Sequence, residues 1–167
     1  MVIKESLTYD DVNIKPLFSD IKHRSNCDVT TKVTKNIDLR IPIVSSPMDT
    51  VTGYRMAQEM NELGGLGIIH RFNSIEEQSS MVARVSLGYV GGAVGVTGDY
   101  LERTQELVMG GCKVICIDVA HGHHQLVKEA MRRIKNEVEG LFDLLVGNIA
   151  TKEAARDLCE WGADGIR

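Results

Sequence analysis

The sequence lacks the features that mark secreted, membrane-spanning or nucleic-acid-binding proteins. No apolar run approaches the roughly 18 residues that cross a bilayer, and the N-terminal residues 1–11 are too mixed and acidic for a signal peptide. A formal net charge of −4 gives no electrostatic reason to expect nucleic acid or a membrane surface as a partner. The four cysteines form no Cys-x-x-Cys pair. We therefore expect reduced thiols and a cytoplasmic protein.

The composition is ordinary for a globular domain. The chain has 167 residues, of which 43% are hydrophobic and 25% charged, enough for one sizeable core. Short apolar runs recur at residues 41–44, 66–69, 93–96, 114–119 and 144–147, and another begins at residue 165. Helix-like patterns follow them at residues 54–63, 75–85, 100–109, 125–138 and 151–161. This alternation predicts strand–helix units around a parallel sheet.

The spacing of these units predicts a β/α barrel, because no Gly-x-Gly-x-x-Gly opening marks a dinucleotide-binding Rossmann domain. Five units and the start of a sixth strand make a partial (β/α)8, or TIM, barrel, the N-terminal portion of the full ring, over residues 41–167. We interpret residues 1–40 as an arm laid against this domain, with a short strand at 28–33. The Gly64–Gly65 and Gly91–Gly92 pairs are expected to make turns. Thr50 or Thr52 is expected to cap the next helix.

Polar residues follow the predicted strands, where a barrel places its active site. Asp118 ends a buried strand and needs a partner, which is a ribose hydroxyl, a helix cap or an internal salt bridge. Ser46 suits hydrogen bonding to a ligand or capping, because no base that would make it a nucleophile is identifiable. Asn148 orients a base or sugar, or makes a turn. Arg167 binds phosphate or carboxylate, or lies on the surface.

The histidines and cysteines carry weaker signals. Three histidines lie close together at His121, His123 and His124 without a carboxylate or thiol cluster. We favour a solvated or helix-capping turn over a metal site, and we predict no metal ligands. Cys116 lies inside a predicted strand and Cys159 on a predicted helix, so we expect both to be structural and neither to be a reactive thiolate.

Six motifs together resemble the IMP dehydrogenase/GMP reductase family. In chain order they are LTYDDV from Leu7, IPIVSSPMDTVTG from Ile41, GGLGIIHR from Gly64, DVAHGH from Asp118, GNIAT from Gly147 and GADGIR from Gly162. Each motif alone is weak, but their combination and order are specific.

The resemblance implies a barrel that is usually tetrameric, with a purine nucleotide site at the strand ends and a nicotinamide cofactor beside it. Residues at the places of Ser46 and Met48 touch the nucleotide in the family. An aspartate at the place of Asp118 binds the cofactor ribose. Residues at the places of Asn148 and Arg167 lie beside substrate and cofactor. The implied cofactor is NAD, or NADP in a reductase.

The Ser-Ser-Pro-Met segment from Ser45 looks closer to the dehydrogenase branch, because reductases tend to have Ala-Asn before the methionine. The chain lacks the paired regulatory CBS modules that dehydrogenases usually insert. In the family, the catalytic cysteine and the glycines that bind phosphate and a monovalent cation follow the strand begun by Gly165. The expected reaction class is oxidation of IMP with NAD and water to XMP and NADH.

The 167 residues stop short of that catalytic loop, so we expect a truncated or split chain that is inactive by itself. The alternatives are a GMP reductase and a non-catalytic barrel fragment that binds nucleotide or joins other subunits. The expected partners are a purine nucleotide and either further copies of this chain or a complementing C-terminal chain.

Overall fold

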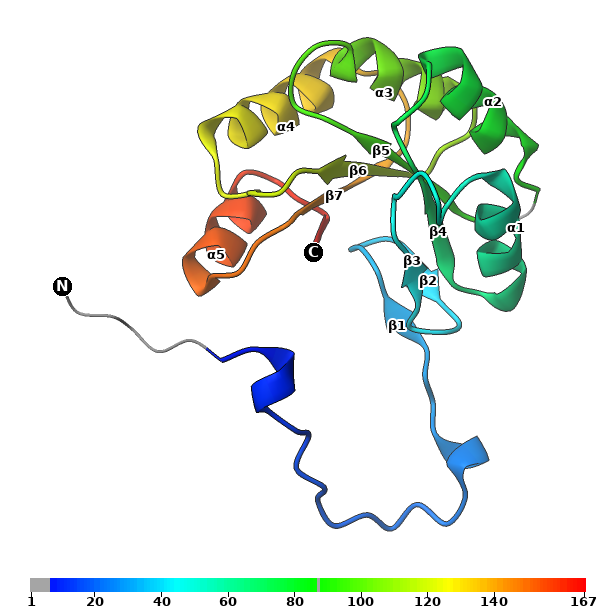
Figure 1. The fold of residues 1–167 in the computed structure, drawn as a ribbon, viewed down its shortest axis with the longest axis vertical. Coiled ribbons are helices and arrows are strands. Elements are labelled where there is room, and N and C mark those ends of the chain that lie inside the picture. The colour runs from blue at the N-terminus through cyan, green and yellow to red at the C-terminus, as the bar shows by residue number, and fades with distance from the viewer. Residues whose placement is uncertain (1–6, 87) are drawn as a thin grey trace, which may run out of the picture.

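Six strands of the computed structural model, which describes residues 7–86 and 88–167, form one parallel sheet (Figure 1). The strands neighbour one another in chain order: β3 (Val44–Ser45), β4 (Leu66–Ile69), β5 (Val90–Val94), β6 (Val114–Asp118), β7 (Asp143–Gly147) and β8 (Gly165–Ile166). The sheet curls into a half-barrel, which confirms the predicted partial (β/α)8 barrel. Parallel neighbours need crossover connections, and a helix supplies each one.

Five helices cover the convex face of the sheet (Figure 1). They are α1 (Tyr54–Leu63), α2 (Ile75–Arg84), α3 (Tyr100–Met109), α4 (Gln125–Glu137) and α5 (Lys152–Glu160). On α4 the buried residues Val127, Ala130, Met131 and Ile134 recur at helical spacing and turn one apolar stripe toward the sheet. These stripes and the outward side chains of the strands form the larger hydrophobic core.

The concave face of the half-barrel holds a second, smaller core. Successive residues of a strand face opposite sides, so Val114 and Cys116 of β6 lie inside while Ile115 and Ile117 pack under the helices. A two-stranded antiparallel hairpin, β1 (Thr31–Lys32) and β2 (Asp38–Leu39), adds side chains to the inner core. The hairpin therefore covers the end of the half-barrel opposite the carboxyl ends of its strands.

The segment before the hairpin runs away from the domain (Figure 1). It contains two short 3-10 helices, η1 (Tyr9–Asp11) and η2 (Arg24–Asn26), and its large apolar side chains are exposed, Ile14 and Phe18 almost completely. The prediction that residues 1–40 form an arm laid against the domain is therefore wrong for residues 7–30, whose apolar side chains are not buried against it. Residues 1–6 of the predicted arm lie outside the described residues.

Several local predictions were wrong, each for an identifiable reason. Strand β5 begins at Val90, so Gly91 and Gly92 lie within the sheet, where a β-carbon on Gly92 would come within 2.8 Å of Leu107. Helix α1 starts after Gly53 without a side-chain cap, because the Thr52 hydroxyl bonds Ser46 and Ser45 instead.

The Gly64–Gly65 turn was predicted correctly: Gly64 ends α1 with φ of 92°.

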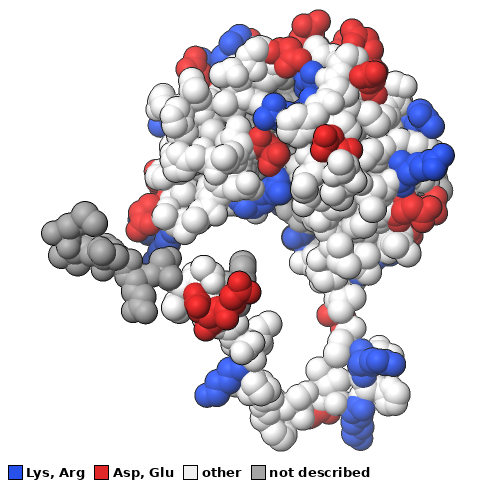
Figure 2. All heavy atoms as spheres, viewed as in Figure 1, with Lys and Arg blue, Asp and Glu red and all other residues white. Residues whose placement is uncertain are grey.

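Basic and acidic side chains are interspersed over the face of the domain seen in Figure 2, and neither sign dominates it. No helix in the described part of the chain is both long and apolar enough to cross a membrane.

Candidate functional site

The carboxyl ends of the parallel strands meet at one edge of the half-barrel, and residues of β6, β7 and β8 are aligned there. Asp118 pairs in register with Gly147 of β7, and Arg167 directly follows β8. Arg167 Nη1 donates a hydrogen bond of 2.7 Å to Asp118 Oδ1, so the arginine spans the intervening strand. Of the three alternatives that the sequence left open for Asp118, the structure therefore contains the internal salt bridge, and its partner is Arg167.

Gly147 makes this crossing possible. A β-carbon at this position would clash first with Arg167 O and would also lie 2.6 Å from Arg167 Cγ, closer than real β-carbons approach other atoms. The side chains of Asp118 and Arg167 keep 24% and 30% of their exposure, so both are reachable from solvent. The pair is thus a half-buried carboxylate and guanidinium at the rim, where a ligand can exchange hydrogen bonds with either group.

Backbone hydrogen bonds tie the loops beyond these three strands together. Asn148 N donates to Val119 O over 2.8 Å, and Asn148 O accepts from Gly122 N over 2.7 Å. Ile149 N donates to Arg167 O over 3.1 Å. The backbone of Asn148 is therefore fixed. Its side chain is exposed, and within residues 7–86 and 88–167 it has no hydrogen bond to another residue.

Ser46 shares a cavity with Arg167 on the concave side of the sheet. The cavity has a volume of about 370 Å³, and its wall includes Val44, Ile68 and Leu145 as well as those two residues. The turn that carries Ser46 is held by the Thr52 hydroxyl, which donates to Ser46 O over 2.6 Å. Arg167 thus lines this cavity together with Ser46 and is paired with Asp118, whereas Asp118 itself and Asn148, at the end of β7, lie outside the cavity wall.

Met48, like Asp118 and Asn148, does not line this cavity. Its backbone N–H bonds to Ser46 O over 2.8 Å, while its side chain remains 52% exposed on the loop. An exposed thioether beside an anchored serine is able to close over a flat ligand, because methionine adapts to varied apolar surfaces.

Two of the three histidines after β6 have hydrogen-bond partners in the structure. His124 is the N-cap of α4 and its Nδ1 accepts from Leu126 N over 3.1 Å, as the capping prediction expected. His123 Nε2 lies 2.8 Å from Asp157 Oδ2 of α5. The described residues contain no cluster of three His, Cys, Asp or Glu side chains that would hold a metal ion.

The thiols are not placed for nucleophilic attack at the rim. Burial raises the pKa of Cys112 and of Cys116 to about 12, so both stay protonated at neutral pH. Cys27 is exposed on the extended N-terminal segment and Cys159 is exposed on α5. None of these residues lines the cavity that Ser46 and Arg167 share.

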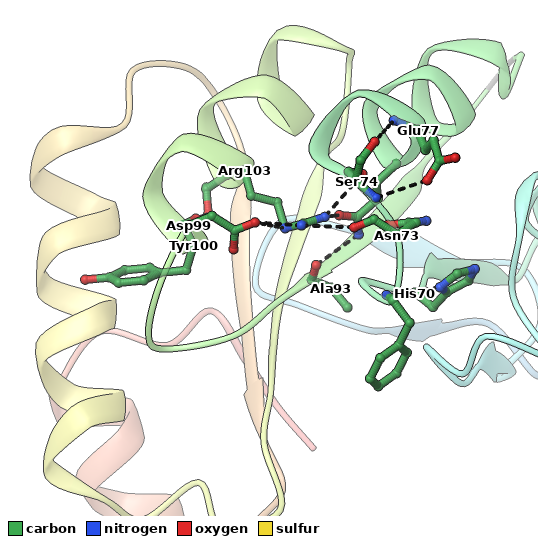
Figure 3. Close-up of polar contacts among 11 residues, drawn as sticks. His70, Asn73, Ser74, Glu77, Ala93, Asp99, Tyr100 and Arg103 are labelled. Carbon is green, nitrogen blue, oxygen red and sulfur yellow. Dashed lines mark hydrogen bonds and ion pairs between the residues drawn. The ribbon is translucent and has the colours of Figure 1, made fainter.

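Sequence reasoning missed a buried polar network beside the rim (Figure 3). Arg103 of α3 is 6% exposed and donates to Asp99 Oδ2, to Gln78 Oε1 and to backbone oxygens of residues 73 and 74. Gln78 in turn donates to Ile69 O over 3.1 Å and to Ala93 O over 2.9 Å. The Asp99–Arg103 spacing of four residues on one helix was the signal available in the sequence.

These features define a parallel β/α-barrel protein with a cavity and an ion pair at the carboxyl ends of its strands, the end at which barrels of this kind place their active sites. The family model described as "IMP dehydrogenase / GMP reductase domain" matches residues 6–167. The chain belongs to the IMP dehydrogenase/GMP reductase family.

Curated relatives carry both names. The chain is 33% identical to inosine-5′-monophosphate dehydrogenase of Cryptosporidium parvum, with 99% of this chain and 51% of the relative aligned. It is 34% identical to the enzyme of that name from Borreliella burgdorferi, over 99% of this chain and 54% of the relative. GMP reductase of Helicobacter pylori strain J99 is 34% identical over 95% of this chain and 49% of its own length. The chain spans about half the length of these relatives.

Proposed function

We propose that this chain carries the nucleotide-facing rim of an IMP dehydrogenase, which converts IMP, NAD and water to XMP and NADH. The observation that carries the proposal is the Asp118–Arg167 pair beside the cavity that Ser46 lines. Arg167 links the two, because it lines the cavity with Ser46 and holds the Asp118 carboxylate. Carboxylate, guanidinium and hydroxyl groups recognise ribose hydroxyls and phosphate. The relatives named for this reaction support the choice of substrate.

Each rim residue has a role that fits its position. Ser46 and Met48 would contact the purine nucleotide, the first by a hydrogen bond inside the cavity and the second by covering it. Asn148 has its side-chain amide free to orient the base or sugar. Arg167 would bind an anionic or carbonyl oxygen of the substrate, using nitrogens that Asp118 does not engage.

Asp118 suits the ribose of the nicotinamide cofactor. Arg167 holds Oδ1, and Oδ2 has no hydrogen bond within the described residues, so one carboxylate oxygen is oriented and the other is available. The free carboxylate oxygen of Asp118 therefore fits a ribose hydroxyl of the cofactor. When bound, the cofactor supplies the nicotinamide ring that accepts hydride. The residues of this chain bind and orient the substrate and the cofactor. No thiol of the described residues lines the cavity, so none is assigned the role of the nucleophile that attacks the substrate.

The second candidate is a GMP reductase that uses NADP. The observation in its favour is the relative of that name in Helicobacter pylori, which shares the 34% identity of the dehydrogenase from Borreliella burgdorferi over a shorter alignment. A third reading is a non-catalytic nucleotide-binding piece that joins other subunits. Within the described residues, β3 and β8 each pair on one side only, and open edges of this kind favour association with further strands.

Calorimetric titration of the 167-residue chain with IMP, GMP, NAD and NADP tests these assignments. We expect saturable binding of IMP that Arg167→Gln weakens roughly tenfold, since a hydrogen bond to a charged group contributes about 1.5–3 kcal/mol. The matched control is Arg132→Gln, which removes the same charge from an exposed site on α4. Preference for GMP and NADP would support the reductase. Absence of binding to all four would refute the proposal, and NAD reduction by this chain alone would refute its lack of a nucleophile.

A further inference from the structure

One side chain, that of His123, attaches the loop between β6 and α4 to helix α5. His123 Nε2 lies 2.8 Å from Asp157 Oδ2, and the two side chains keep 33% and 39% of their exposure. An ionised carboxylate only accepts hydrogen bonds, so the imidazole nitrogen donates in this contact. Within residues 7–86 and 88–167, no other hydrogen bond joins the loop 119–124 to α5.

Helix α5 presents two groups to the imidazole. Asp157 and Trp161 are four residues apart at the end of the helix, a spacing that puts both on one face. The centre of the Trp161 ring lies 5.9 Å from that of His123, and Lys128 Nζ of α4 lies 5.1 Å from the same tryptophan ring. Trp161 is the single tryptophan of the chain, so its fluorescence reports on this contact.

The same loop also contacts the end of β7. Gly122, the neighbour of His123, donates its N–H to Asn148 O over 2.7 Å, and a β-carbon on Gly122 would come within 2.9 Å of that oxygen. At the other end of the loop, Val119 directly follows Asp118, and its carbonyl accepts from Asn148 N over 2.8 Å. A shift of the loop would therefore move Asp118 relative to Asn148.

Helix α5 starts from that strand end, so the contacts form a ring. Its N-cap residue Thr151 closely follows Asn148, and the Thr151 hydroxyl accepts from Ala154 N over 3.1 Å. The chain leaves Asn148, forms α5 and returns through Asp157 to His123. Without the His123–Asp157 hydrogen bond, the loop would keep its backbone bonds to Asn148 but lose its attachment to α5.

We propose that His123 is a positioning residue: its hydrogen bond to Asp157 holds the loop after β6 and keeps Asp118 in a fixed place relative to Asn148. The inference rests on the proposed function, in which Asp118 binds the ribose of the cofactor. A binding group that supporting hydrogen bonds already hold in place loses less freedom when its ligand binds. Ser46 lies on a different loop, so the effect should fall on the cofactor and spare the purine nucleotide.

The test is a double-mutant cycle in the 167-residue chain, with His123→Phe, Asp157→Ala and the two together. Phenylalanine keeps a ring beside Trp161 and removes the donor. In calorimetric titration with NAD, each single substitution should weaken binding about threefold to tenfold, as expected for a partly exposed hydrogen bond to a charged group. The double variant should bind no more weakly than either single one. IMP affinity should stay within about twofold in all three, because the cavity that Ser46 lines is not attached to this loop.

Two further measurements need no ligand. Hydrogen exchange at Gly122 N should be about threefold to tenfold faster in each single variant, because the amide separates from Asn148 O when the loop is released. Asp157→Ala should also expose Trp161 to quenching by acrylamide. His123→Gln keeps an N–H donor at a similar distance from the backbone, so it should restore part of the NAD affinity and slow the Gly122 exchange again.

His23→Phe is the matched control, because His23 is exposed on the N-terminal segment and its side chain caps no helix. It should change neither NAD affinity nor Gly122 exchange. Circular dichroism checks that the variants fold, and should His123→Phe misfold, Asp157→Ala carries the test alone.

A purely structural bond would give a different pattern. Variants that lower the free energy of unfolding but leave NAD affinity and Gly122 exchange unchanged would overturn the positioning role. If the unaltered chain bound no NAD, the proposed function would fail, and Gly122 exchange would then decide the inference. Unchanged exchange would overturn it, and faster exchange in both single variants would support it.

Discussion

Arg167 reaches across β7 to Asp118, and the two residues meet at 2.7 Å although 49 positions separate them in the chain. The parallel sheet makes this contact possible, because Asp118, Gly147 and Arg167 occupy one row across three strands. Arg167, the last residue of this row, lines the cavity that Ser46 also lines. The Asp118–Arg167 contact thus depends on Gly147, which lies between the two charged residues and has no side chain.

Gly147→Ala should separate the pair without removing either charge. The new β-carbon would clash with Arg167 O and would lie 2.6 Å from Arg167 Cγ, so both the backbone and the side chain of Arg167 have to move. We expect purine nucleotide affinity to fall roughly tenfold to a hundredfold, the equivalent of one charge-assisted hydrogen bond. Calorimetry with IMP measures this.

The control for that substitution is Gly53→Ala, where the nearest atom to an added β-carbon is Met81 Sδ at 3.8 Å and the backbone φ is −95°. The control should bind as the unaltered chain does. Equal affinities of the two alanine variants would show that the Asp118–Arg167 contact does not support the site.

Arg103 should be a major determinant of stability near the rim. Lysine at this position keeps the charge but loses the planar fork that joins Asp99 to Gln78. We expect Arg103→Lys to lower the free energy of unfolding by roughly 2–4 kcal/mol, because buried polar partners are left unsatisfied. Denaturant titration followed by circular dichroism gives the value.

Arg133→Lys is the comparison for Arg103. Arg133 pairs with Glu137 at an exposed position of α4, and the arginine holds the pKa of Glu137 below its usual range. Its replacement should cost far less stability than Arg103→Lys, because solvent screens an exposed pair. Similar losses for both variants would argue against a special role of the buried network.

Sequence reasoning predicted the half-barrel because strands buried on both faces and amphipathic helices alternate with a readable period. It also placed Asp118 and Arg167 on one edge, since strand ends in a parallel sheet coincide. The Arg103–Gln78 bond joins residues 25 positions apart on separate helices, and no local pattern specifies that contact. The exposure of residues 7–30 likewise depends on tertiary contacts that the apolar residues themselves do not reveal.

The buried thiols should make the fold sensitive to alkali. Burial raises the pKa of Cys112 and Cys116 to about 12, above the ordinary thiol value of 9.0. The contribution of the buried, protonated thiols to the free energy of unfolding is therefore complete below pH 9. It is lost as the pH rises toward 12, because the thiols of the unfolded chain release their protons at lower pH than those of the folded chain. The expected loss is about 1.4 kcal/mol per pH unit for each thiol.

Denaturant unfolding of the unaltered chain and of Cys116→Ala at pH 8, 9 and 10 tests this dependence. The variant should lose less stability above pH 9 than the unaltered chain does. Cys159→Ala, on the exposed side of α5, serves as the control and should keep the full alkaline slope. Parallel pH curves for all three chains would contradict the assignment of the slope to the buried thiol.

The hairpin should depend on one buried carboxylate at the opposite end of the half-barrel. Asp143 is 7% exposed, and its oxygens accept from the Thr34 hydroxyl, from Asn36 N and from Asn36 Nδ2. Asp143→Asn would place an amide donor against these donors, and we expect a loss of roughly 2–3 kcal/mol in unfolding free energy. Hydrogen exchange should show the loss as faster opening of the backbone hydrogen bond from Val33 N to Ile37 O.

Asp38→Asn is the matched control for this last prediction, because it makes the same change in an ion pair with Lys32 whose side chains are 70% and 61% exposed. The control should alter stability by less than about 1 kcal/mol. If Asp143→Asn were equally mild, the hairpin would be held by the apolar contacts of Ile37 and Leu39 with the inner core, and the carboxylate would be dispensable.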